Sequence, residues 1–155
     1  MPKVIEGSLT SKGLRLAIAA GRFNEFITGR LLEGAMDVIT RSGGDAAGTV
    51  VMKVPGSFEL PLAAKQLAES GKYDAVICLG AVIRGQTAHH EHVAGQMARG
   101  ISTVMLDTGI PVSFGVITAD SLEQAIERAG TKDGNKGSSA ALAAIEMANA
   151  IKGLN

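Results

Sequence analysis

Four short apolar runs, separated by longer stretches with helical spacing, constrain the fold of this 155-residue chain more than any other feature. The runs cover residues 14–20, 49–54, 75–79 and 112–118, and each is rich in Ala, Val, Ile or Leu. Near-continuous apolarity, as opposed to alternation, is typical of strands in a parallel sheet that is covered on both faces. The runs therefore predict four buried, parallel strands.

The stretches between these runs predict helices. Residues 25–41 place apolar side chains on one broad stripe, namely Phe26, Leu31, Leu32, Ala35, Met36 and Ile39. Further helices are predicted at residues 58–70, ended by Gly71, and at residues 89–103, 121–129 and 135–151. Asp120 or Ser121 would begin the fourth helix, with Glu123 completing a capping box.

Alternating strands and helices imply right-handed crossovers and a layered α/β fold. The length of the chain fits one domain, residues 1–155. Residues 4–9 resemble a further strand without a partner in a four-stranded sheet. We expect this segment to be an edge addition, either to this sheet or to that of another subunit.

Composition excludes several classes of function. Fifteen basic residues balance fifteen acidic ones, so no global field attracts nucleic acid or an anionic membrane. No apolar run approaches the roughly 18 residues that a membrane span needs. The single cysteine, Cys78, lies in an apolar run and fits a buried side chain in a reducing compartment. We therefore expect a cytoplasmic protein with a local binding site and no nucleic-acid or membrane partner.

Ligands of open parallel sheets bind outside the carboxyl ends of the strands. Here that rule selects the loops at residues 21–24, 55–59, 80–89 and 119–120. All three histidines of the chain, His89, His90 and His92, lie in or directly after the third loop. Phe23 and Phe58 lie in the first two loops, although aromatic residues make up only 3% of the chain. We expect these loops to form the active face.

Neither a Gly-x-Gly-x-x-Gly fingerprint after a strand nor a P-loop occurs in the sequence, which argues against dinucleotide and nucleoside triphosphate chemistry. The turn at residues 85–87 opens into a helix, so its N–H groups and the Thr87 hydroxyl could hold a phosphate. Thr87 could equally be a helix cap. Arg84 and Arg128 are candidate cations, or else solvated surface charges.

A metal site does not fit the histidine cluster. Successive helical side chains turn by about 100°, so His89 and His92 share a face while His90 points elsewhere. One ion would gain two ligands at most, and we expect no metal. The more specific interpretation is that His89 acts as a general acid–base, and the alternative is that it caps the helix.

Three other residues have more than one interpretation. Phe23 could stack on a heterocycle or serve as a hydrophobic staple for the next helix. Glu59, at a predicted helix start, could bind a polar ring or polyol, or act as a cap. Phe114 lies inside a predicted strand and is ambiguous.

Together these motifs resemble the 6,7-dimethyl-8-ribityllumazine synthase family, which catalyses the penultimate step of riboflavin biosynthesis. The resemblance runs from Val4 to Leu154. It rests on Gly21-Arg-Phe-Asn24, Val54-Pro-Gly-Ser-Phe-Glu-Leu-Pro61, Gly80-Ala-Val-Ile-Arg-Gly-Gln-Thr-Ala-His89, Phe114-Gly-Val-Ile-Thr118, Glu123-Gln-Ala-Ile-Glu-Arg-Ala-Gly-Thr-Lys132 and Gly134-Asn-Lys-Gly137.

The resemblance implies a transferase with a flavodoxin-like α/β/α sandwich around a four-stranded parallel sheet. It condenses 5-amino-6-(D-ribitylamino)uracil with 3,4-dihydroxy-2-butanone 4-phosphate and needs no metal or organic cofactor. His89 would transfer protons. The implied substrate-binding residues are Phe23, Ser57, Phe58, Glu59, Ala81, Val82, Ile83, Gln86, Thr87, Phe114, Arg128 and Lys136.

The resemblance also implies an assembly. Family members form pentamers, and some close into icosahedral capsids. Phe114 and Arg128 would face a neighbouring subunit's loops, and riboflavin synthase is a candidate protein partner. A catalytically weak scaffold is the alternative function. The chain departs from the usual family pattern at three positions. An aromatic residue is common in the family at the position of His90, a small residue at that of Gln86, and an acidic residue at that of Ser139.

Overall fold

The computed structural model describes residues 1–85, 89–131 and 134–155, and the side chains of residues 89 and 90 lie outside the described part. The elements in chain order are β1 (Leu16–Gly21), α1 (Glu25–Arg41), β2 (Val50–Val54), the 3-10 turn η1 (Ser57–Glu59), α2 (Leu60–Glu69), β3 (Ala75–Ile83), α3 (His89–Thr108), β4 (Val112–Ala119), α4 (Leu122–Arg128), β5 (Ala129–Thr131), β6 (Gly134–Asn135) and α5 (Lys136–Lys152).

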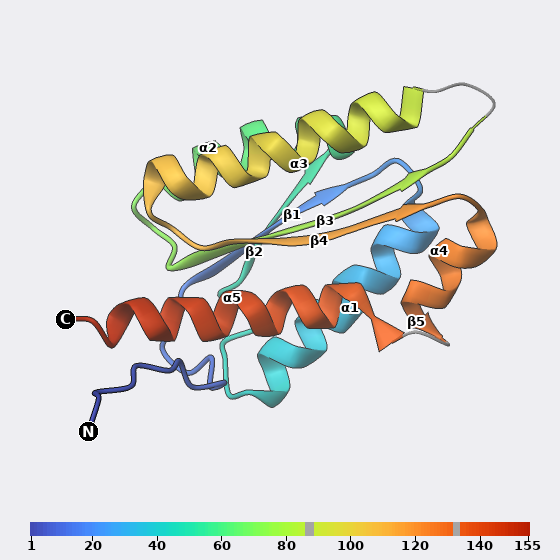
Figure 1. The fold of residues 1–155 in the computed structure, drawn as a ribbon. Coiled ribbons are helices and arrows are strands. Elements are labelled where there is room, and N and C mark those ends of the chain that lie inside the picture. The colour runs from blue at the N-terminus through green and yellow to red at the C-terminus, as the bar shows by residue number, and fades with distance from the viewer. Residues whose placement is uncertain (86–88, 132–133) are drawn as a thin grey trace.

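The four predicted strands form one parallel sheet in the order β2-β1-β3-β4. Helices α2 and α3 cover one face of the sheet, and α1, α4 and α5 cover the other (Figure 1). This strand order is that of a flavodoxin-like sheet, in which the chain reverses its direction of winding beside β1. The predicted three-layer α/β/α sandwich is confirmed.

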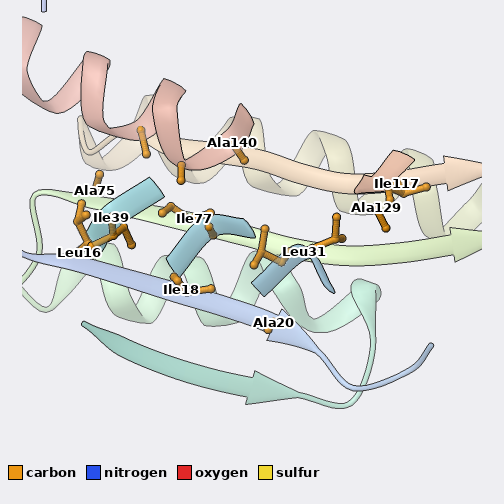
Figure 2. Packing of buried hydrophobic residues seen from close by; sticks show 14 of the residues in the cluster. Leu16, Ile18, Ala20, Leu31, Ile39, Ala75, Ile77, Ile117, Ala129 and Ala140 are labelled. Atoms are coloured by element: carbon orange, nitrogen blue, oxygen red, sulfur yellow. The ribbon is translucent and has the colours of Figure 1, made fainter. Parts of the chain in front are cut away.

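Two hydrophobic cores, one on each face, explain why the strands read as continuous apolar runs. Along β1, Leu16, Ile18 and Ala20 point to the core formed with α1 and α5 (Figure 2). The intervening Ala17 and Ala19 point to the core formed with α2 and α3. Because side chains alternate between the two faces, a strand covered on both must be apolar at every position.

The prediction was wrong about the burial of β2. Val50, Val51 and Met52 are 40, 36 and 38% exposed, because β2 is an edge strand and only Val54 is fully covered. Hydrophobic composition alone does not distinguish an edge strand from a central one.

Phe26 does not lie on the buried stripe of α1, contrary to the prediction. Its side chain is 62% exposed, and the Arg30 guanidinium lies 4.9 Å from its ring centroid. The adjacent Ile27 is buried instead, with Leu31, Ala35 and Ile39 following at helical spacing.

The predicted starts and ends of elements differ from the structure mainly near loops. Strand β3 continues to Ile83 and α3 continues to Thr108, each beyond its predicted end. Ser121 caps α4 by accepting a hydrogen bond from the Gln124 N–H, and the Gln124 side chain accepts one from the Asp120 N–H. Gln124, and not Glu123, is thus the reciprocal partner of the cap. The short antiparallel pair β5–β6 was not predicted.

Residues 4–9 form no strand within this chain. They run beside α5, where the Asn149 side-chain amide donates hydrogen bonds of 2.8 Å to the carbonyls of Ser8 and Thr10. Addition to the chain's own sheet was therefore a wrong expectation, and addition to another subunit stays a prediction. Within the described ranges, none of the helices is long and apolar enough to span a membrane.

Candidate functional site

A cavity of about 500 Å³ opens where β1, β2 and β3 end. We call it the first cavity. The end of β3, the loops after these three strands and the start of α3 supply its lining: Phe23, Pro55, Gly56, Ser57, Phe58, Glu59, Ala81, Val82, Ile83, Gly85 and Val93. Three of the four loops predicted to form the active face thus meet here, whereas the loop at residues 119–120 borders neither this cavity nor the second one described below.

The first loop holds Phe23 at the mouth of this cavity. Hydrogen bonds from the Arg22 N–H to the Val54 carbonyl, at 2.8 Å, and from the Phe23 N–H to the Pro55 carbonyl, at 3.0 Å, tie this loop to the end of β2. The Phe23 side chain remains 71% exposed. A large apolar ring held open to solvent by an ordered backbone is suited to stacking on a flat ligand.

The second loop is packed tightly against β3. Ser57 is buried at the start of η1, and a Cβ atom added at Gly80 would lie 2.6 Å from its hydroxyl oxygen. A side chain at position 80 would therefore have to displace Ser57, and glycine leaves it in place. The half-buried Glu59 and the exposed Phe58 follow Ser57 on the cavity wall.

The end of β3 forms an apolar wall. Ala81 and Val82 are buried and Ile83 is half-buried. The Ala81 carbonyl accepts a hydrogen bond of 3.2 Å from the Asn24 side-chain amide, which joins the first loop to this wall.

A second cavity of about 360 Å³ lies beside the edge strand β4. Its lining is Phe114, Val116, Ile117, Thr118, Arg128 and Lys136. Arg128 ends α4 and donates a hydrogen bond of 2.9 Å to the Thr118 carbonyl, while Lys136 begins α5 and lies 5.7 Å from the Phe114 ring centroid. Two cations and a helix N-terminus give this cavity a positive potential that favours an anion.

The structure thus divides the predicted site residues between two cavities that share no lining residue. Phe23, Ser57, Phe58, Glu59, Ala81, Val82 and Ile83 line the first cavity, and Phe114, Arg128 and Lys136 line the second. Gln86 and Thr87 lie outside the described residues. His89 begins α3, four residues after Gly85 of the first cavity in the sequence, and its side chain lies outside the described part.

Several residues that shape these cavities were not predicted from the sequence. Val93 lines the first cavity one helical turn after His89, a spacing that could have revealed it. Thr118 lines the second cavity, and Arg84 lines neither. Ser139, one of the departures from the family pattern, is exposed and donates a hydrogen bond to the Asn135 carbonyl.

Metal and thiol chemistry find no support in the described residues. Among the described side chains, which leave out those of His89 and His90, no three from His, Cys, Asp or Glu gather as a metal site would require. Burial raises the pKa of the Cys78 thiol to about 12, so it is not a nucleophile near neutral pH.

Comparison with known proteins adds an independent finding. Residues 13–152 match the sequence profile of a family described as 6,7-dimethyl-8-ribityllumazine synthase. A protein of that name from Syntrophus aciditrophicus (strain SB) is 57% identical over 152 residues, which are 98% of this chain and 99% of the relative. The similarity therefore includes both cavities and every predicted site residue.

Proposed function

This chain belongs to the 6,7-dimethyl-8-ribityllumazine synthase family, and from that premise we propose how its two cavities carry out the reaction. The chain is a transferase that condenses 5-amino-6-(D-ribitylamino)uracil with 3,4-dihydroxy-2-butanone 4-phosphate in riboflavin biosynthesis. One phosphate and two waters leave as the second ring of the lumazine forms.

The first cavity binds the pyrimidine substrate in this proposal. The Phe23 ring stacks on the heterocycle, while Ser57, Phe58 and Glu59 bind the ribityl chain and the ring edge. Backbone groups of residues 81–83 hold the other edge of the ring. The observation that carries the proposal is that all of these residues line one cavity of about 500 Å³, a volume suited to a ligand of this size.

The four-carbon phosphate binds between residues 86–87 and a guanidinium. The phosphate carries charge that needs both hydrogen-bond donors and a cation. Gln86 and Thr87 supply donors beside the helix start, and Arg128 supplies the cation. Lys136 adds positive charge, since it shares the second cavity with Arg128.

His89 transfers the protons. The primary amine of the pyrimidine attacks the ketone, and one water leaves to give an imine. Phosphate is then eliminated, the resulting enol tautomerises to a ketone, and the second amine attacks that carbonyl and expels a second water as the ring closes. Each step moves a proton near neutral pH, which is the range of an imidazole. Holding two substrates in register supplies much of the remaining rate.

A complete site forms between two subunits in this proposal. Arg128 and the first cavity serve one reaction, yet in a single chain they belong to separate cavities. A neighbouring copy that presents its second cavity to this chain's first cavity would unite them. We propose a homo-oligomer, a cytoplasmic pentamer that assembles further into an icosahedral shell, with riboflavin synthase as its protein partner. Light scattering tests the assembly, and a mass near 15.9 kDa would contradict it.

The experiment that tests the activity mixes the purified protein with both substrates and follows lumazine absorbance and fluorescence. We expect product with the native protein and a much lower turnover with His89→Ala, at unchanged particle mass. Absence of product at high protein concentration would contradict the catalytic role. An unchanged rate in His89→Ala would remove His89 from proton transfer. No observation on the described residues favours a scaffold without catalysis.

A further inference from the structure

Asn24 has the only left-handed backbone among the non-glycine residues that the structure describes, with φ 63° and ψ 44°. This conformation is uncommon for a residue with a side chain, and asparagine tolerates it better than most. The residue follows Phe23 directly and precedes α1, so its backbone angle sets where the Phe23 ring leaves the loop. Strained backbone of this kind persists where surrounding contacts hold it in place.

The Asn24 side chain does not cap its own helix, although asparagine is among the preferred capping residues. Its Nδ2 atom instead donates a hydrogen bond of 3.2 Å to the Ala81 carbonyl, which is 57 residues away in sequence. The Asn24 backbone carbonyl meanwhile accepts hydrogen bonds from the N–H groups of Ile27 and Thr28. One residue therefore joins the Phe23 loop, the start of α1 and the end of β3.

We propose that Asn24 is a positioning residue that sets the distance between the Phe23 ring and the opposite wall of the first cavity. This inference rests on the proposed function, because it assumes that the pyrimidine ring lies between Phe23 and residues 81–83. The hydrogen bond to Ala81 ties the residue after Phe23 to the first residue of that wall. The same hydrogen bond uses one lone pair of the Ala81 carbonyl oxygen.

Two variants separate the side-chain hydrogen bond from the backbone angle. Asn24→Gly adopts the left-handed conformation freely but lacks the amide donor. Asn24→Asp keeps the size and much of the tolerance for that conformation, but places a carboxylate against the Ala81 carbonyl. We expect the KM for the pyrimidine to rise about fivefold in Asn24→Gly, the effect of losing one hydrogen bond, and further in Asn24→Asp. The KM for the four-carbon phosphate should change less than about twofold.

Asn149→Ala is the matched control. Asn149 also donates its side-chain amide to backbone carbonyls, those of Ser8 and Thr10, but from the last turn of α5. The C-terminal end of α5 lies on the opposite side of the view from the start of α1 (Figure 1). We expect Asn149→Ala to lower Tm without changing either KM. Equal rises in both KM values of the Asn24 variants, or a lower Tm with neither KM changed, would overturn the positioning role.

A double-mutant cycle completes the test. Calorimetry measures the affinity of each variant for the pyrimidine substrate alone. If Asn24 acts through Phe23, the affinity of Phe23→Ala/Asn24→Gly should match that of Phe23→Ala. Full additivity of the two losses would refute the inference while leaving Phe23 in its role. If Phe23→Ala itself binds the pyrimidine normally, the proposed function is wrong at Phe23 and the inference is wrong with it.

Discussion

Gly80 shows how a single residue with no side chain shapes the first cavity. A methyl group there would lie 2.6 Å from the Ser57 hydroxyl oxygen and 3.2 Å from Leu60 Cδ1. We predict that Gly80→Ala displaces Ser57, lowers the free energy of unfolding by about 1–3 kcal/mol and weakens pyrimidine binding. Urea unfolding and substrate titration measure the two effects. Gly29→Ala in α1 is the control, since an added methyl group meets nothing within 4 Å and should be neutral or stabilising.

Burial suppresses the reactivity of the Cys78 thiol. Its side chain is fully covered in the core under α2 and α3, and its pKa is raised to about 12 by desolvation. We predict that a thiol reagent at pH 8 leaves the native protein unlabelled and modifies one group per chain in concentrated denaturant. Stoichiometric labelling of the native protein within minutes would show that the core opens readily.

The sequence identifies the residues that line the candidate site better than the residues that hold them in place. Phe23 and Glu59 were predicted because each follows a predicted strand and has a side chain suited to a ligand, whereas Ser57 was predicted from the family resemblance. Asn24 and Gly80 could not be found in the same way, because their importance depends on contacts with Ala81 and Ser57 across the fold.

At the scale of elements, Asp74 links β1, β3 and α5. Its carboxylate accepts a 2.7 Å hydrogen bond from the Arg15 N–H, and the Arg15 guanidinium and the Lys152 ammonium lie 3.2 and 3.6 Å from it. Burial alone raises the pKa of Asp74. The hydrogen bonds from Arg15 and the charges of Lys152 and Arg15 outweigh burial and hold that pKa below its ordinary value of 3.8.

A carboxylate with a lowered pKa in the folded state stabilises the fold above its unfolded pKa, and this contribution disappears as pH falls through the folded value. We predict that Asp74→Asn loses about 1–2 kcal/mol at pH 7 and that the difference from the native chain shrinks below pH about 4. Urea unfolding across pH measures both. Asp37→Asn, which breaks the exposed pair with Arg41, should change little at any pH. A constant deficit for Asp74→Asn down to pH 2 would contradict the ionic explanation.

Elements whose apolar side chains face a single core were the easiest to predict. Helix α1 has the predicted bounds, because one apolar stripe faces one core. The ends of β3 and α3 were harder, since they depend on neighbouring elements: the last residues of β3 pair with β4 as far as Ala119. Strand β2 was misjudged for the same reason, because sheet order decides its exposure and order is not a local property.

Across the whole chain, the two cavities lie apart, although one reaction is proposed to use residues from both. The described chain has an apolar cavity with an exposed ring and, separately, a cationic cavity beside the edge strand β4. Apolar side chains also remain exposed on this edge and on α5, including Phe114, Leu142 and Met147. A cyclic assembly would let every subunit give its first cavity to one neighbour and its second cavity to the other, so that each site is complete.

Subunit mixing tests this arrangement directly. One variant, Phe23→Ala/Glu59→Ala, is defective in the first cavity, and the other, Arg128→Ala, is defective in the second. Each alone should have very low activity. If every site combines halves from two subunits, random mixing in equal amounts leaves both halves intact in about a quarter of the sites, so that co-refolded or co-expressed mixtures recover about a quarter of native activity. If one chain supplied a whole site, every site would keep one defect and the mixture would be no more active than the average of its components. Mixing folded particles without unfolding is the control, and it should restore activity only as fast as subunits exchange.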